Sequence, residues 1–90
     1  MTDLAVVPTF RRGVKFRLDE VRNRWIVLAP EKLLLPDEIA TEILKLVDGT
    51  RSIDAIVDDL ASRFDAPREV ICGDVVQALQ SLSTRGAIRL

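Results

Sequence analysis

The sequence contains no histidine and no tyrosine, and Cys72 is its single cysteine. These residue types supply many of the general bases, nucleophiles and zinc ligands of proteins. Because no histidine can activate its thiol, Cys72 is best interpreted as a small apolar side chain. Neighbouring carboxylates such as Asp58 and Asp59 do not share a face of a helix, so they are interpreted as solvated surface. We therefore expect a protein that is not an enzyme and that carries no metal or other cofactor.

Targeting signals and phosphate-binding motifs are missing as well. The four glycines are scattered and form no glycine-rich phosphate loop. A short apolar stretch at residues 4–7 follows Asp3 and runs into Pro8, unlike a secretory signal, and a single cysteine cannot form an internal disulfide. No apolar run approaches the roughly 20 residues of a membrane-spanning helix. These absences predict a cytoplasmic protein without a membrane partner.

What the sequence does contain is enough apolar material for one folded domain. Hydrophobic residues make up 48% of the 90 residues and charged residues 30%, which is typical of globular chains. Residues 1–10 show no sustained period and are expected to form a flexible arm in front of a single domain at residues 11–90. Residues 1–36 hold seven basic and four acidic side chains, whereas residues 37–90 hold six basic and ten acidic. The front of the chain is therefore mildly basic and the remainder acidic.

Three short strands are expected in the front part of the domain. Apolar and polar residues alternate over residues 14–18, which is the period of a half-buried strand. Residues 25–29 form a continuous apolar run that suits a central strand. Residues 32–35 can form a third strand before Pro36, which has no amide hydrogen to continue a ladder. The simplest arrangement is a three-stranded antiparallel meander.

Three helices are expected after the sheet, each with an apolar stripe that faces inward. Asp37 and Ser52 are predicted N-caps of the first two helices, and Asp65 followed by Pro67 is the predicted start of the third, which ends at Gly86. The predicted inward residues are Ile39, Ile43, Leu46 and Val47, then Ile53, Ile56, Val57, Leu60 and Phe64, then Ile71, Val75, Leu79 and Leu82. Residues 87–90 can add a short extended piece. This order predicts a winged-helix-like α+β domain.

Such a domain can read nucleic acid with its third helix or bind a peptide at the edge of its sheet. The expected third helix carries one basic side chain, Arg68, and two acidic ones, Glu69 and Asp74, so it is a poor match for phosphates and base edges. The basic side chains of the first strands, including Lys15 and Arg17, have no aromatic platform beside them and are interpreted as a solvated outer face. We expect no nucleic-acid partner.

A peptide site needs an unpaired strand edge and a neighbouring apolar groove. Leu33, Leu34 and Leu35 follow one another, so both faces of the third strand are apolar. Cys72 and Val76 flank the inward stripe of the third helix and are candidates for the other wall. The alternative is that the third helix or the arm covers the strand edge permanently and that the flanking residues are peripheral core. The pattern alone does not decide between these two interpretations.

Several short runs resemble the PqqD family, over about residues 10–90. They are Arg24-Trp25-Ile26-Val27-Leu28-Ala29-Pro30-Glu31, Asp37-Glu38, Ile43-Leu44, Asp48-Gly49, residues 56–64, Ala66-Pro67, and Asp74-Val75 with Leu79, Leu82 and Gly86. The resemblance implies a peptide chaperone, or recognition element for ribosomally made and modified peptides, in pyrroloquinoline quinone (PQQ) biosynthesis. Such a protein would bind the precursor peptide PqqA and deliver it to PqqE, a radical S-adenosylmethionine enzyme with iron–sulfur clusters that joins a glutamate to a tyrosine.

The same resemblance implies where the peptide would bind. It would pair with the third strand and lie beside the third helix, and the candidate residues are Lys32, Leu33, Leu34, Leu35, Cys72 and Val76. Pro36 and the Ala87-Ile88 ending depart from the family pattern, and Pro36 puts the register of the peptide in doubt. Two alternatives from other functional classes stay open. One is a winged-helix nucleic-acid binder, and the other is a dimerisation module that forms a homodimer and has no affinity for a peptide.

Overall fold

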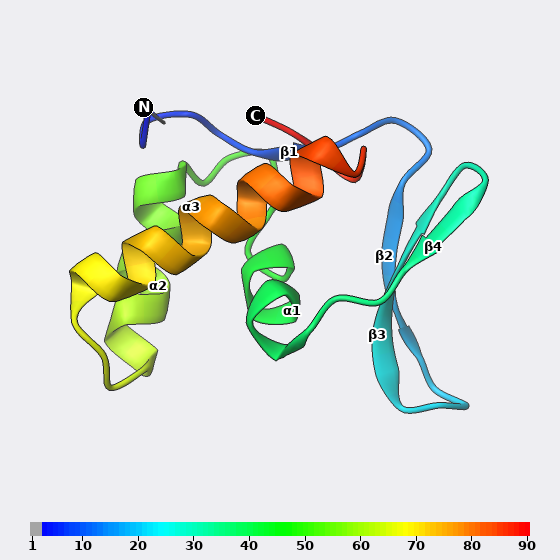
Figure 1. Cartoon of the computed structure of the whole chain (residues 1–90), viewed down its shortest axis with the longest axis horizontal. Coiled ribbons are helices and arrows are strands. Elements are labelled where there is room, and N and C mark those ends of the chain that lie inside the picture. The colour runs from blue at the N-terminus through cyan, green and yellow to red at the C-terminus, as the bar shows by residue number, and fades with distance from the viewer. Residues whose placement is uncertain (1–2) are drawn as a thin grey trace.

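The alternating front part of the chain forms a three-stranded antiparallel sheet in the computed structural model, which describes residues 3–90 (Figure 1). The strands are β2 (Lys15–Asp19), β3 (Arg24–Ala29) and β4 (Lys32–Leu34), in the spatial order β2-β3-β4. The predicted meander is therefore confirmed. Val27 is opposite Phe16 in β2 and Leu34 in β4, so these three side chains share the inner face. β3 is central, and β2 and β4 are the edges.

Three helices follow the sheet, as the periodicity predicts: α1 (Glu38–Leu44), α2 (Ile53–Arg63) and α3 (Arg68–Thr84). The caps of the first two are confirmed. Asp37 Oδ1 accepts a hydrogen bond from the Ala40 amide at 2.8 Å, and Ser52 Oγ accepts one from the Ala55 amide at 3.1 Å. Within residues 3–90, no helix is long and apolar enough to cross a membrane.

The start of α3 differs from the prediction. Its N-cap is Pro67, which makes no side-chain capping bond, so the expectation that Asp65 caps this helix is wrong. Asp65 lies two residues before the cap position, whereas a cap side chain bonds the amides two or three residues after itself. The C-terminal end agrees with the prediction: Gly86 has a φ of +82°, and the Ala87 amide donates to the Leu82 carbonyl at 3.0 Å.

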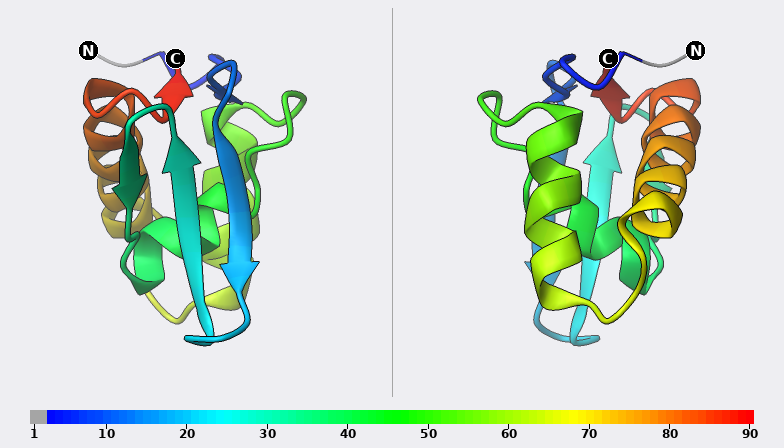
Figure 2. Two further views of the ribbon diagram at one scale, coloured as in Figure 1. Left: turned by 90° about the vertical axis from the view of Figure 1, so that its right-hand side faces the viewer. Right: turned by 90° about the vertical axis from the view of Figure 1, so that its left-hand side faces the viewer.

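The hydrophobic core lies between the inner face of the sheet and the helices, which all cover that one face (Figure 2). Helix stripes predicted to face inward supply most of it. Ile39 and Phe64 are exceptions, with 55% and 48% of their surface exposed. Both lie at the ends of short helices and border a pocket described below. The buried core comprises Val27, Ile43, Leu44, Leu46, Val47, Ile53, Ile56, Val57, Leu60, Ile71, Val75, Leu79, Leu82, Ala87 and Ile88.

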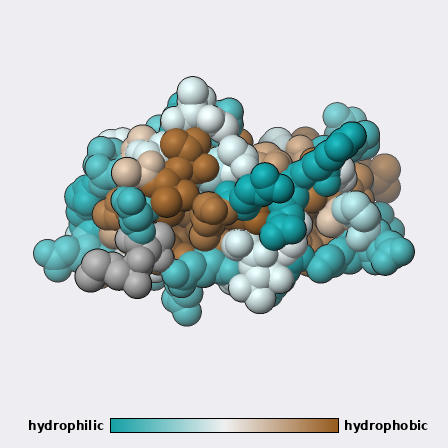
Figure 3. Space-filling view, turned by 90° about the horizontal axis from the view of Figure 1, so that it is seen from above, coloured by the Kyte–Doolittle hydropathy of each residue, from teal (hydrophilic) through white to brown (hydrophobic). Residues whose placement is uncertain are grey.

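The two ends of the chain meet in a small second sheet that the sequence did not reveal. β1 (Thr9–Phe10) pairs antiparallel with β5 (Ile88–Arg89). The arm in front of β1 is docked through its backbone, because the Leu4 and Val6 carbonyls accept the first amides of α2. Residues 1–2 of the predicted flexible arm lie outside the described residues. Figure 3 shows this side from above, where apolar and polar side chains lie next to each other.

Gly73 lies inside α3, where glycine lacks the stabilising side chain of a good helix former. A Cβ atom added at this position would meet nothing within 4 Å, so no close backbone approach requires glycine here. We expect Gly73→Ala to raise the free energy of unfolding by about 0.5–1 kcal/mol. Urea denaturation followed by far-UV circular dichroism measures this change. A destabilised variant would show that something else occupies the space beside Gly73.

Candidate functional site

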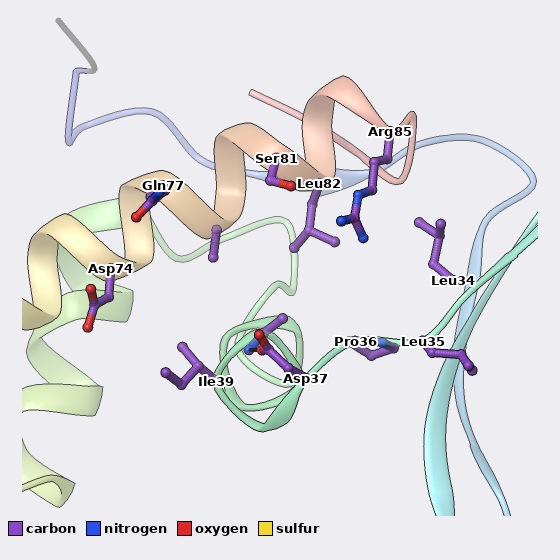
Figure 4. A pocket seen from close by; sticks show the side chains of 12 residues that line it. Leu34, Leu35, Pro36, Asp37, Ile39, Asp74, Gln77, Ser81, Leu82 and Arg85 are labelled. Carbon is purple, nitrogen blue, oxygen red and sulfur yellow. Dashed lines mark hydrogen bonds between the residues drawn. The ribbon is translucent and has the colours of Figure 1, made fainter.

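A groove of about 410 Å³ runs between the end of β4, the start of α1 and one side of α3 (Figure 4). Leu34, the last residue of β4, and Leu35 lie at one end of the groove, and Leu82 of α3 and Arg85 at the C-cap of α3 point into the groove. The groove therefore combines a strand edge with a helix wall, which is the arrangement a bound extended peptide needs. The lining residues are Leu34, Leu35, Pro36, Asp37, Ile39, Ala40, Asp74, Gln77, Ala78, Ser81, Leu82 and Arg85.

The register of the β3–β4 hairpin decides which amides of β4 are available at its outer edge. Ala29 and Lys32 flank a two-residue turn, so the Lys32 amide points to the Ala29 carbonyl and toward β3. Hydrogen-bonded and non-hydrogen-bonded pairs alternate along an antiparallel ladder. Leu34, opposite Val27, therefore also bonds to β3, whereas Leu33, opposite Leu28, points its amide and carbonyl away from β3. The backbone groups of β4 that are available at its outer edge are therefore the amide and carbonyl of Leu33.

One side-chain bond fixes the distance between β4 and the end of α3. The Lys32 ammonium Nζ donates to the Arg85 carbonyl at 2.7 Å. Carbonyls at the last turn of a helix have no partner within the helix, and a cation is favourable there. Lys32 therefore ties the edge strand to the C-terminus of α3 and sets the width of this end of the groove.

The two ends of the groove differ in charge. Arg85 lies at the β4 end, and Asp74 lies at the other end, near Ile39 (Figure 4). The Arg85 side chain makes no ion pair with any residue in the described range 3–90. Asp37 also lines the groove, but one of its oxygens already caps α1. A bound peptide would therefore find the Arg85 cation at one end of the groove, the Asp37 carboxylate between the ends and the Asp74 carboxylate at the other end.

A second pocket of about 200 Å³ continues from the acidic end of the groove, with which it shares Ile39 and Asp74. It lies among the three helices, and Phe64 and Ile39 form its apolar border. Glu42 is on the rim of this pocket. A hydrogen bond from Lys45 and a weaker effect of one from Arg63 hold the pKa of the Glu42 carboxyl below its usual value. The exposed positions of Ile39 and Phe64 thus coincide with a hollow surface rather than with the core.

The predicted site residues separate into two groups in the structure. Leu34 and Leu35 line the groove, Lys32 does not line it but bonds the carbonyl of the lining residue Arg85, and Leu33 offers its backbone at the edge. Cys72 and Val76 do not line the groove and instead pack against the core. At about 100° per residue, they lie nearly opposite the groove-lining side of α3. The lining residues that the sequence did not indicate as site residues are Pro36, Asp37, Ile39, Ala40, Asp74, Gln77, Ala78, Ser81, Leu82 and Arg85.

The groove is lined by apolar side chains with a few polar ones between them. Across residues 3–90, no cluster of three or more His, Cys, Asp or Glu side chains is placed to hold a metal ion. The polar groups that line it, Gln77, Ser81 and the carboxylates, can accept or donate hydrogen bonds to an extended chain. The arrangement can bind a peptide through a backbone edge and apolar side chains.

Known proteins are similar to this chain in sequence and in fold. Residues 24–88 match the model of the family described as coenzyme PQQ synthesis protein D, PqqD. The chain belongs to the PqqD family. A relative from Rhodopseudomonas palustris (strain BisB5), called PqqA binding protein, is 52% identical over 79 residues, which cover 88% of this chain and 78% of the relative. The predicted resemblance is therefore confirmed.

Solved structures agree with the PqqD assignment. The PqqD part of Methylobacterium extorquens PqqCD, described as a functional and stand-alone recognition element for ribosomally synthesised and modified peptides, superposes with a TM-score of 0.82. It is 34% identical, and the alignment covers 100% of this chain and 96% of that one. Lasso peptide synthetase B1 in complex with its leader peptide has a TM-score of 0.81 at 14% identity, over 94% and 100% of the two chains, so it shares the fold.

Proposed function

We propose that the chain binds the precursor peptide PqqA as an additional strand on the open edge of β4. The observation that carries this proposal is the free backbone of Leu33 beside a groove whose other wall is α3. Main-chain hydrogen bonds would supply affinity, and the apolar groove would select side chains. The name of the Rhodopseudomonas relative, PqqA binding protein, and the membership in the PqqD family support the choice of peptide.

The chain would act in the cytoplasm by presenting the peptide to the radical enzyme PqqE, without turnover of its own. A sequence without histidine or tyrosine offers few residues for acid–base chemistry, which supports this division of labour. Chemistry would then belong to the enzyme, and the chain would bind the peptide in a fixed stoichiometry.

The proposal is tested by titrating PqqA into the purified chain in a calorimeter, with a peptide of scrambled sequence as control. We expect one peptide per chain and no heat from the scrambled peptide. By mass spectrometry, we expect no covalent change in PqqA until PqqE, S-adenosylmethionine and a reductant are added. Product formed from PqqA by the chain alone would refute the absence of turnover. Equal affinity for both peptides would refute specific recognition.

Salt dependence separates a peptide binder from a nucleic-acid binder. A protein that neutralises six to ten phosphates loses roughly 10³- to 10⁵-fold in affinity between low and physiological salt. We expect PqqA affinity to change by only about threefold over that range, because backbone bonds and apolar contacts dominate. Fluorescence anisotropy of labelled PqqA and of labelled duplex DNA measures both. Tight, steeply salt-dependent DNA binding without peptide binding would favour the nucleic-acid alternative.

A further inference from the structure

The outer face of the three-stranded sheet carries half-buried and exposed apolar side chains, and no other element within residues 3–90 lies over them. Residues alternate between the two faces along a strand. Because Val27 is buried on the inner face, its chain neighbours Ile26 and Leu28 point outward. Leu33 lies opposite Leu28 on the same face and is 50% exposed. Figure 2 (left) shows the sheet in front of the helices, with nothing between this face and the viewer.

Basic side chains border this apolar strip. Lys15 is the cross-strand neighbour of Leu28, and Arg17 is the neighbour of Ile26. Arg24 follows on β3, two residues before Ile26. Within residues 3–90, the side chains of these three cations make no hydrogen bond or ion pair. We define Lys15, Arg17, Arg24, Ile26, Leu28 and Leu33 as the outer sheet face.

On the helical side of the molecule, the two arginines of α2 and α3 are already paired with carboxylates, whereas Arg85 at the end of α3 is not paired with any in the described part of the chain. Arg68 bonds both Asp54 and Asp58, and Arg63 bonds Asp59 and Glu42. Three cations without a carboxylate partner among the described residues, Lys15, Arg17 and Arg24, thus lie beside the apolar strip, and the one carboxylate opposite Arg24, that of Asp19, is paired with Arg22. Such an arrangement complements a protein surface with an apolar centre and carboxylates around it.

Two other occupants fit less well. If two copies met through this face, Lys15 and Arg17 would lie against like charges. For nucleic acid, the face lacks an aromatic platform, since Trp25 and Phe16 stack on each other on the opposite face of the sheet. Phosphates would also have to lie against Ile26 and Leu28. An acidic protein surface therefore fits both the charge and the apolar strip.

We propose that the outer sheet face is the docking surface for an acidic, apolar-centred surface of the enzyme that modifies the bound peptide. The proposal rests on the peptide-presenting function above. Peptide and enzyme would use different parts of the same sheet, the edge of β4 and the outer face, so both can be bound at once. Leu33 belongs to both: its backbone faces the peptide and its side chain faces the enzyme.

The size of the face determines the strength of docking. With strands about 4.8 Å apart and residues about 3.3 Å apart, the outer sheet face, which spans three strands and residues 24–28 of β3, measures roughly 10 Å by 13 Å. Stable protein interfaces bury about 800 Å² on each partner, so this face supports a reversible complex unless neighbouring loops add area. A carrier that hands over its peptide repeatedly needs such a complex.

The test uses the double variant Lys15→Glu/Arg17→Glu and the apolar variant Leu28→Thr. The control is Arg51→Glu/Arg89→Glu, which changes the net charge equally at exposed sites outside the outer sheet face. For each chain, PqqA affinity is measured by calorimetry and docking to immobilised PqqE by biolayer interferometry. We expect both test variants to dock about tenfold or more weakly, with PqqA affinity within about twofold of the parent. The control should behave like the parent in both measurements.

The other possible results of these two measurements would each contradict a different part of the proposal. Test variants that dock to PqqE like the parent would overturn the proposed docking face while leaving peptide binding intact. A parent chain that binds PqqA but not PqqE would overturn the docking proposal and the presenting role together. Test variants that lose PqqA affinity would place the peptide on this face and would contradict the groove. Duplex DNA bound by the parent and released by Lys15→Glu/Arg17→Glu would assign the face to nucleic acid.

Discussion

Leu33→Pro is expected to weaken PqqA binding on the order of tenfold to a hundredfold while the domain remains folded. The Leu33 amide points to the open edge, so proline there removes a donor to the peptide but no bond to β3. Leaving the matching peptide carbonyl without a partner costs about 1–3 kcal/mol, and 1.4 kcal/mol corresponds to tenfold in affinity. Calorimetric titration with PqqA measures the change.

Two matched variants separate the backbone from the side chain. Leu33→Ala keeps the amide, and its side chain lies outside the groove, so PqqA affinity should stay close to that of the parent. Leu34→Pro removes a bond of the β3–β4 ladder and should lower the free energy of unfolding instead. Equal PqqA binding by a folded Leu33→Pro chain and by the parent would show that the peptide does not pair with β4.

The largest effect on stability is expected from Leu79→Ala. Leu79 is fully buried in α3, on the side that packs against the core. Removing a buried leucine costs both transfer free energy and a cavity, together about 2–5 kcal/mol, out of a total of about 5–15 kcal/mol for a domain. The melting temperature should fall by roughly 10 °C or more. Thermal melting followed by circular dichroism provides the measurement.

Gln77→Ala is the control for this variant, because Gln77 lies on the same helix but is exposed in the groove. Its free energy of unfolding should stay within about 0.5 kcal/mol of the parent. A loss of less than about 1 kcal/mol in Leu79→Ala would mean that α3 is not held by the core as the structure shows.

Local patterns predicted the main elements correctly because each depends on neighbours in the sequence. The alternation at residues 14–18 and the caps at Asp37 and Ser52 are local signals, and all are confirmed. The β1–β5 sheet was missed because two-residue strands have no period to detect. Its pairing also depends on contacts between the two ends of the chain. Asp65 was misassigned because proline can begin a helix without a side-chain cap.

The site was harder to predict than the fold. The sequence identified the edge strand, since three consecutive leucines are unusual on an exposed strand. It did not indicate which side of α3 faces that edge. The wide apolar arc of α3 indicates Cys72 and Val76 as groove residues, yet the groove is lined by the polar side of α3 that carries Gln77 and Ser81. The role of Cys72 and Val76 in peptide binding stays a prediction, and only the tertiary position of α3 relative to β4 identifies the lining.

The closure of the chain ends has a consequence for the order of folding. The Arg11 side chain donates to the Ile88 carbonyl across 77 residues of sequence, next to the β1–β5 pairs. Closing so long a loop costs more chain entropy than forming the β2–β3 hairpin or packing α2 on α3. The ends should therefore join after the hairpin and helices have formed, and they should separate first in partial opening. The groove, built from β4, α1 and α3, can thus persist while the ends open.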